Sequence, residues 1–392
     1  MAVAFLWIAP KEVAQATQIG KKGCIAHTLS PLFSPNSPIS QNFSLFRSQF
    51  SVFLLSLQRY LLKQKIVNRE LYFHMEYIYL LACLGVIIFS ANTLVSGSVV
   101  VAKRFKISDF VIGAVIVGVG TSFPELVVST LGAIDGNSAI AIGNVVGSNI
   151  FNIMGILGLT AVVAPVAVSR ENKRFDLPFC LAVSVLALLL VFNFFTGGDA
   201  VISRADSFVL LSVFLLFMYL SLRGNKKNEV KEVEVTITNK QFIVGLFKVV
   251  FGLVALVVAS DIFLDNAVAV AKSWGVNDAF ISITLIACGT SMPELAASLA
   301  AAAKKNTQLA LGNVVGSNIF NLLLILGVGA QVTPLTTSGI TLVDYAMVVL
   351  AAILPWVLGL DGRLSRKEGA VMFTCFVLYN IYLLNSQMHF LF

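Results

Sequence analysis

The sequence predicts an all-α integral membrane protein with ten transmembrane helices, arranged as two inverted five-helix repeats. Hydrophobic residues make up 57% of the chain and charged residues 12%, whereas a soluble domain carries about 25% charged residues. The string GNVVGSNIFN occurs at 143–152 and again at 312–321. Each copy lies in a unit with five apolar stretches, and an odd number of spans inserts the second unit into the membrane the other way up.

Ten apolar stretches approach the length of about 20 residues that a helix needs to cross a bilayer. They lie near 76–101, 111–134, 139–164, 177–195, 207–222, 242–271, 279–303, 308–332, 342–359 and 369–388. The connections after odd-numbered spans hold 16 Lys and Arg residues, and those after even-numbered spans, with the C-terminus, hold 2. Basic loops stay in the cytoplasm, so the odd-numbered connections are predicted to be cytosolic.

The spans divide the chain into four segments. These are an N-terminal extension (1–74), a first five-helix repeat (75–222), a mixed-charge cytosolic linker (223–240) and a second five-helix repeat (241–392). The extension has no counterpart in the second half of the chain. Two interpretations remain open for it: a basic targeting segment, or a spurious extension upstream of a true start at Met75.

Each repeat carries a proline followed directly by a glutamate inside an apolar span. A constant offset of 169 residues carries GTSFPE at 120–125 onto GTSMPE at 289–294. Proline lacks an N–H and breaks the helix, which frees main-chain carbonyls, and free carbonyls in lipid need a partner. Glutamates at membrane depth are costly and mark functional sites, so Glu125 and Glu294 are predicted to form the centre of the site.

The duplicated string adds further oxygen atoms. Ser148 and Asn152 lie four residues apart, on one helix face, and Ser317 and Asn321 repeat this spacing. Hard cations prefer such all-oxygen surroundings, and Ca²⁺ takes six to eight ligands. Two glutamates carry a charge that balances one Ca²⁺ or two Na⁺. The predicted metal ligands are Glu125, Glu294, Asn152, Asn321, Thr121, Ser122, Thr290, Ser291, Ser148 and Ser317.

Other functional classes are disfavoured. The five cysteines are scattered without a CxxC pair, and the three histidines lie outside the predicted spans, so a soft or borderline metal is disfavoured. No Walker-type phosphate loop and no Ser/His constellation occurs. The chain is therefore predicted not to be an enzyme and to need no cofactor, and its net charge of +7 reflects membrane topology rather than nucleic-acid binding.

The paired motifs GTSFPE/GNVVGSNIFN and GTSMPE/GNVVGSNIFN resemble the two alpha-repeats of the calcium/cation antiporter superfamily, and most closely its prokaryotic sodium/calcium exchangers. The resemblance covers about 76–392. It implies an ion site at the membrane midplane, alternating access by sliding of the first helix of each half, Glu125 and Glu294 as shared ligands of Ca²⁺ and Na⁺, and a prokaryotic plasma (inner) membrane. One departure is that many members carry Asp at one of the positions held here by Asn152 and Asn321.

The predicted function is secondary active antiport of Ca²⁺ against Na⁺ by a multi-pass protein surrounded by membrane lipid. One chain supplies both half-sites, so a monomer suffices. One alternative is a Ca²⁺/H⁺ antiporter, in which the same glutamates carry protons. A cation channel is the more remote alternative, because a channel needs a continuous pore, often lined by rings of subunits.

Overall fold

The computed structural model describes residues 69–192, 200–224, 237–274, 287–336 and 340–388. By its contacts the chain forms two compact units, Met1–His74 and Met75–Phe392. Most of the first unit lies outside the described residues, so the role of the predicted N-terminal extension stays a prediction.

Helices make up most of the described chain. In the first half they are α5 (Arg69–Phe105), α6 (Asp109–Ile112), α7 (Val119–Thr121), α8 (Phe123–Ile134), α9 (Ser138–Ile150), α10 (Gly158–Val163), α11 (Leu177–Val191) and α12 (Arg204–Gly224). In the second half they are α13 (Asn239–Ser273), α15 (Ala287–Gly289), α16 (Met292–Ala303), α17 (Thr307–Phe320), α18 (Leu326–Val332), α19 (Leu342–Leu358) and α20 (Arg366–Met388). A 3₁₀ turn follows α19 at Gly359–Asp361.

Within the described residues, four π-helical turns join α-helices or begin one: Gly113–Gly118, Phe151–Leu157, Asn172–Asp176 and Asn321–Ile325. The described residues also form two small antiparallel sheets, which were not predicted and which join connections far apart in the sequence. They pair β1 (Val166–Ala167) with β4 (Arg363–Leu364) and β2 (Val201–Ile202) with β3 (Leu335–Thr336).

The predicted helical membrane class is confirmed. Seven helical rods within the described ranges are long and apolar enough to cross a membrane, and a bent pair, Asp109–Thr121 with Phe123–Ile134, makes an eighth. Helices suit lipid because they satisfy their own backbone hydrogen bonds. The seventh predicted span, 279–303, lies partly outside the described residues. The count of ten and the inverted arrangement therefore stay predictions.

The bend falls at the first proline motif. The two parts of this span meet at 47°, and α8 begins directly after the break with Pro124 in its first turn. The second motif has the same local form, because α16 begins after Ser291 with Pro293 in its first turn. The backbones of Ser122 (φ −81°, ψ 11°) and Ser291 (φ −91°, ψ 13°) agree closely. Each proline therefore starts a fresh helix at its glutamate, as expected for a residue that cannot sit in a helix interior.

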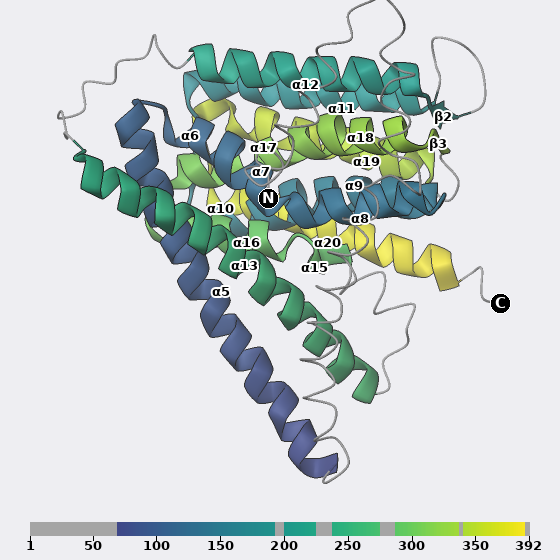
Figure 1. Ribbon diagram of the computed structural model, residues 1–392. Coiled ribbons are helices and arrows are strands. Elements are labelled where there is room, and N and C mark those ends of the chain that lie inside the picture. Colours follow the sequence, from purple (N-terminus) through teal and green to yellow (C-terminus); the bar gives the residue numbers. More distant parts are fainter. Residues whose placement is uncertain (1–68, 193–199, 225–236, 275–286, 337–339, 389–392) are drawn as a thin grey trace, which may run out of the picture. The chain divides into compact units, whose positions relative to one another are not determined.

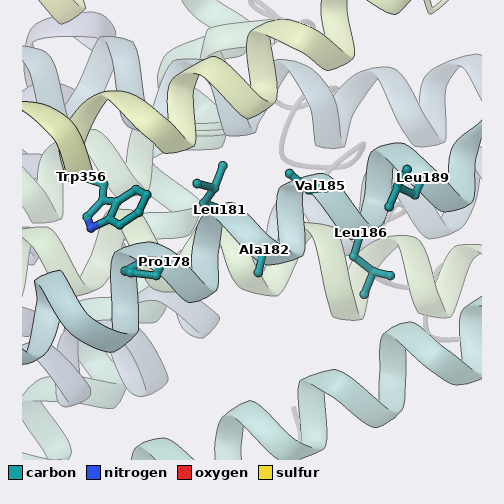
Figure 2. A pocket seen from close by; sticks show the side chains of 7 residues that line it. All are labelled: Pro178, Leu181, Ala182, Val185, Leu186, Leu189 and Trp356. Atoms are coloured by element: carbon teal, nitrogen blue, oxygen red, sulfur yellow. The ribbon is translucent and has the colours of Figure 1, made fainter.

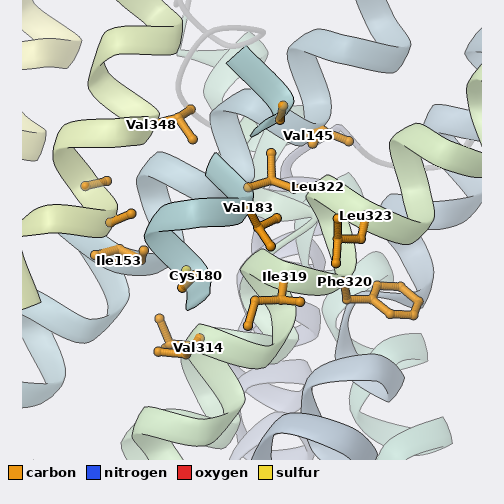
Figure 3. Close-up of a cluster of buried hydrophobic side chains, with 14 of the residues drawn as sticks. Val145, Ile153, Cys180, Val183, Val314, Ile319, Phe320, Leu322, Leu323 and Val348 are labelled. Atoms are coloured by element: carbon orange, nitrogen blue, oxygen red, sulfur yellow. The ribbon is translucent and has the colours of Figure 1, made fainter. Parts of the chain in front are cut away.

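The core is centred on α9 and α17, the rods that carry the duplicated string. In each rod, we compare the most apolar window of 18 residues. The buried share of this window is 94% in the rod Thr307–Val332 and 78% in the rod Ser138–Val163, but only 17–39% in the other five rods. Figure 3 shows Val314, Ile319 and Leu323 from α17 and its π-helical turn among side chains such as Val145 and Val183. The other rods expose much of their apolar surface, as lipid-facing helices do.

Two glycines bring α17 against the first half of the chain. A methyl group added at Gly312 would overlap the carbonyl oxygen of Phe110, and one added at Gly316 would overlap the backbone of Ala114. Small residues at four-residue spacing allow this close approach between membrane helices. In the other copy, the segment equivalent to Phe110 and Ala114 falls at residues 279 and 283, outside the described residues.

Gly316→Ala is expected to destabilise the fold. The added methyl group has no space beside Ala114, and overpacking of a tight contact costs about 1–3 kcal/mol. Gly85→Ala is the matched control, because Gly85 is exposed on α5 and a methyl group there meets nothing within 4 Å. Thermal unfolding of both purified variants checks this. A Gly316→Ala protein that melts no lower than Gly85→Ala would contradict the close contact.

The long helices α5 and α13 form an antiparallel pair. The C-terminal end of α5 meets the N-terminal end of α13, where Arg104 donates a hydrogen bond to Asn239 at 3.2 Å. Farther along, Gly97 packs against Gly245 and Gly252 against Leu94. Figure 1 shows both helices running obliquely to the rods that carry the duplicated string.

Candidate cation site

The two motif glutamates are fully buried. Glu125 lies in the first turn of α8 and Glu294 in the first turn of α16, and both side chains are 0% exposed. A helix N-terminus favours a negative charge, which offsets part of the cost of burying a carboxylate. Hydrogen bonds or a bound cation must offset the rest of that cost.

Each glutamate is bonded by the serine of the opposite motif. Ser122 donates a hydrogen bond to Oε1 of Glu294 at 2.7 Å, and Ser291 donates one to Oε1 of Glu125 at 2.9 Å. Motifs that lie 169 residues apart in the sequence therefore form a single polar cluster, in which each half of the chain completes the site of the other half.

Several buried polar side-chain atoms of the motifs have no hydrogen-bond partner. They include Oε2 of Glu125 and of Glu294, Oγ of Ser148, and the side-chain amides of Asn152 and Asn321. Unsatisfied buried polar groups are rare in native proteins, and an unseen ion is one recognised explanation. Carboxylate, amide and hydroxyl oxygens are the ligands of hard cations. The donor set of the cluster consists of oxygens and contains no sulfur or imidazole, which suits Ca²⁺ or Na⁺.

The remaining predicted residues differ between the two copies. Ser317 donates to the carbonyl of Gly118 at 3.2 Å and lies 3.5 Å from Oε1 of Glu294, whereas Ser148 has no partner. Asn152 lies within the π-helical turn Phe151–Leu157, and Asn321 begins the turn Asn321–Ile325. Such turns are frequent at functional sites. Asn152 and Asn321 are fully buried, but no hydrogen bond connects either of them to a glutamate.

The threonine hydroxyls point toward asparagines. Thr121 lies 3.3 Å from Oδ1 of Asn313, as well as 3.0 Å from the carbonyl of Val117. Thr290 lies 3.5 Å from Oδ1 of Asn144. The structure therefore brings Ser291 into contact with Glu125, and Ser122 and Ser317 into contact with Glu294. The hydroxyls of Thr121 and Thr290 face the neighbouring amides.

Asn144 and Asn313 were missing from the predicted site. Asn144 donates to the carbonyl of Glu125 at 3.2 Å and to Oγ of Ser129 at 2.9 Å. Asn313 donates to the carbonyl of Glu294 at 3.2 Å and to Oγ of Ser298 at 2.9 Å. The signal that identifies them is their place as second residue of the duplicated string GNVVGSNIFN.

A further asparagine pair joins the two copies of the string. Nδ2 of Asn318 donates to the carbonyl of Asn149 at 3.0 Å, and the Oδ1 atoms of both residues are buried without a partner. These residues connect α17 to α9 next to Ser148 and Ser317. The polar cluster therefore continues along the contact between the two most buried rods.

Comparison with known proteins gives a consistent result. A family profile described as sodium/calcium exchanger protein matches residues 75–223 and 244–385. The putative antiporter CaxA of Alkalimonas amylolytica is 34% identical over 323 residues, covering 79% of this chain and 98% of that protein. The sodium/calcium exchanger MaX1 of Methanosarcina acetivorans is 30% identical, with 79% and 98% covered. The inner membrane protein YrbG of Escherichia coli is 31% identical, with 70% and 86% covered.

A similar fold is known from solved structures. The sodium-calcium exchanger NCX_Mj, soaked with 10 mM Na⁺ and no Ca²⁺, superposes with a TM-score of 0.69 at 29% sequence identity. The superposition covers 78% of this chain and 98% of the solved chain.

Proposed function

The chain belongs to the sodium/calcium exchanger protein family, and we propose that it exchanges Ca²⁺ for Na⁺ at the cluster around Glu125 and Glu294. It is a multi-pass membrane transporter, and we assign it to the plasma (inner) membrane of a prokaryotic cell. One observation carries the site assignment: two fully buried glutamates are each bonded by a serine of the opposite motif. Such an arrangement gives one chain a closed site with a charge of about −2, which balances one Ca²⁺ or two Na⁺.

Within this proposal the glutamates supply the charge and the other residues supply neutral oxygens. The Oε2 atoms of both glutamates, with the amide oxygens of Asn152 and Asn321, have no other buried partner. Ser122, Ser291, Ser148 and Ser317 add hydroxyl oxygens. Thr121 and Thr290 add oxygens at the break before each proline. Together they exceed the six to eight ligands that Ca²⁺ takes, so Ca²⁺ and Na⁺ can use overlapping subsets and compete.

The transport cycle is alternating access by two inverted repeats of five helices. The local structure supports the repeat, because equivalent positions adopt equivalent conformations. Gly136 (φ 72°) and Lys305 (φ 61°) both have left-handed backbones, and the side chains of Asn137 and Asn306 both cap the following helix. The paired helices α5 and α13 are the first helices of the two halves, and their sliding opens one side at a time.

Exchange rather than leak follows from the charge of the site. Two bare carboxylates in a low-dielectric interior are strongly unfavourable. The unloaded protein therefore resists switching between its two open states, whereas Ca²⁺ or Na⁺ removes the penalty. Ca²⁺ and Na⁺ therefore enter and leave one buried site in turn, as in a carrier.

Reconstitution into proteoliposomes tests the proposed function. An outward Na⁺ gradient is expected to drive ⁴⁵Ca²⁺ uptake, and an equal K⁺ gradient is not. Uptake driven equally well by a proton gradient without Na⁺ would favour the Ca²⁺/H⁺ alternative. Uptake that needs no counter-ion and does not saturate would indicate a channel.

Cysteine labelling tests the inverted topology at one equivalent pair of positions. In a background without the native cysteines, Gly136→Cys is expected to react with a membrane-impermeant maleimide only from outside. Lys305→Cys is expected to react only from the cytosol. Both residues are exposed and lie in the same type of turn, so their reactivity depends on the side of the membrane. Labelling of both from one side would contradict the inverted repeat.

A further inference from the structure

We propose that Asn144 and Asn313 are positioning residues that couple the two halves of this site, an inference that rests on the proposed function. Each asparagine binds the main chain of the glutamate in its own half. The amide oxygen of each asparagine also faces the threonine hydroxyl of the opposite motif, at 3.3 Å for Asn313 and Thr121 and at 3.5 Å for Asn144 and Thr290. The amide thereby sets where the carboxylate stands relative to the serine that bonds it from the other half.

The second-half asparagine shows the geometry most clearly. Asn313 is fully buried, and its Nδ2 donates to the carbonyl of Glu294 at 3.2 Å. A main-chain carbonyl only accepts hydrogen bonds, so the nitrogen of the amide must face it. The amide oxygen is then directed to the hydroxyl of Thr121, 3.3 Å away.

Glu294 is contacted at two places, at its carboxylate by Ser122 and at its main-chain carbonyl by Asn313. Ser122 donates to the carboxylate of Glu294 at 2.7 Å. Its neighbour Thr121 reaches the main chain of the same glutamate through Asn313. A movement of the Thr121–Ser122 turn therefore displaces the carboxylate and the main chain of Glu294 together. Without the amide, Glu294 would keep the contacts of its carboxylate with Ser122 and Ser317 but would lose the one that holds its main chain, so the carboxylate would be free to shift relative to the two serines.

The threonine–asparagine contact differs in length and burial between the two halves. Thr290 lies 3.5 Å from Asn144, and both residues are partly buried. Thr121 lies 3.3 Å from Asn313, and both are fully buried. Hydrogen bonds weaken as they lengthen, and burial strengthens them. The coupling through Asn313 is therefore expected to be stronger than the coupling through Asn144, and the two asparagines can be compared within one protein.

A double-mutant cycle on the full-length protein measures this coupling. Thr121→Val removes the hydroxyl, Asn313→Ala removes the amide, and a third variant carries both changes. Equilibrium binding of ⁴⁵Ca²⁺ to the purified protein, with Na⁺ as competitor, is the readout. Each single change is expected to weaken Ca²⁺ binding about tenfold, and the double variant is expected to bind about as weakly as the worse single one, because residues in one network are not additive.

Two controls separate positioning from a general loss of packing. Asn172→Ala removes a buried asparagine that bonds Asp176 outside the site; it is expected to lower the melting temperature without changing Ca²⁺ affinity. Asn144→Ala, in the weaker link, is expected to reduce Ca²⁺ affinity less than Asn313→Ala.

Additive effects of Thr121→Val and Asn313→Ala would overturn the coupling. So would an Asn313→Ala protein with an altered melting temperature and wild-type affinity. Failure of the proposed function has a different signature, because the wild-type protein itself would then bind neither Ca²⁺ nor Na⁺ or would not exchange them.

Discussion

Glu125→Gln and Glu294→Gln are each expected to lower the initial rate of Na⁺-driven Ca²⁺ uptake by about 100-fold or more, which corresponds to about 2.7 kcal/mol. Glutamine keeps the shape of the side chain but removes half of the charge of the site. The other carboxylate alone leaves bound Ca²⁺ with an uncompensated positive charge in a low-dielectric interior. Each glutamate accepts a hydrogen bond from the serine of the opposite motif and supplies half of the charge, so neither single change is expected to be mild.

The measurement is ⁴⁵Ca²⁺ uptake into proteoliposomes that contain equal amounts of inserted protein. Glu171→Gln, at an exposed position before α11, is the matched control and is expected to transport normally. A single glutamine variant that keeps more than about half of the wild-type rate would contradict a shared two-carboxylate site, because such a site loses far more than a factor of two with one charge.

Much of the helical framework was predictable because each helix that crosses the lipid needs an apolar stretch of about 20 residues. The predicted span 342–359 corresponds to α19, Leu342–Leu358, and the predicted span 111–134 corresponds to the bent rod Asp109–Ile134. Apolar length alone carries this information. The small sheets β1–β4 and β2–β3 were not predicted, because a two-residue strand leaves no periodicity to detect.

The duplication predicted which residues would meet, but not how they would pair. Ser122 precedes Glu125 by three residues, yet its hydroxyl binds Glu294. That exchange depends on two helix ends facing each other across the core, which local spacing does not specify. Asn144 and Asn313 escaped prediction for a related reason: they act on main-chain carbonyls, and any residue type supplies a carbonyl.

Burial explains why the two copies of the string differ in their contacts although their sequences are identical. Gly312 and Gly316 place α17 directly against the rod that begins at Asp109. Ser317 is thereby carried to the carbonyl of Gly118 and toward Glu294. Its counterpart Ser148 lies in a less buried rod and has no partner. Two copies of one sequence can therefore make different contacts, because the packing around them differs.

Asn321→Asp is expected to tighten Ca²⁺ binding about tenfold or more and to raise the Na⁺ concentration that releases bound Ca²⁺. Asn321 is fully buried, and both polar atoms of its amide have no other partner. Two unit charges about 4 Å apart interact by about 4 kcal/mol at an effective dielectric constant of about 20. A divalent ion gains about twice as much from a new carboxylate as Na⁺ does. The maximal exchange rate is expected to fall, because Ca²⁺ leaves more slowly.

Two measurements on Asn321→Asp and Asn321→Ala check this prediction. The alanine variant removes an oxygen ligand without adding charge, so it is expected to weaken Ca²⁺ binding, opposite in sign to the aspartate variant. Thermal unfolding gives a second readout. In a chelator, a third carboxylate close to Glu125 and Glu294 adds like-charge repulsion and lowers the melting temperature, whereas saturating Ca²⁺ stabilises the aspartate variant more than it stabilises the wild-type protein. If both variants bound Ca²⁺ with wild-type affinity, Asn321 would not face the ion, and the site would have to be built from the glutamates and serines alone.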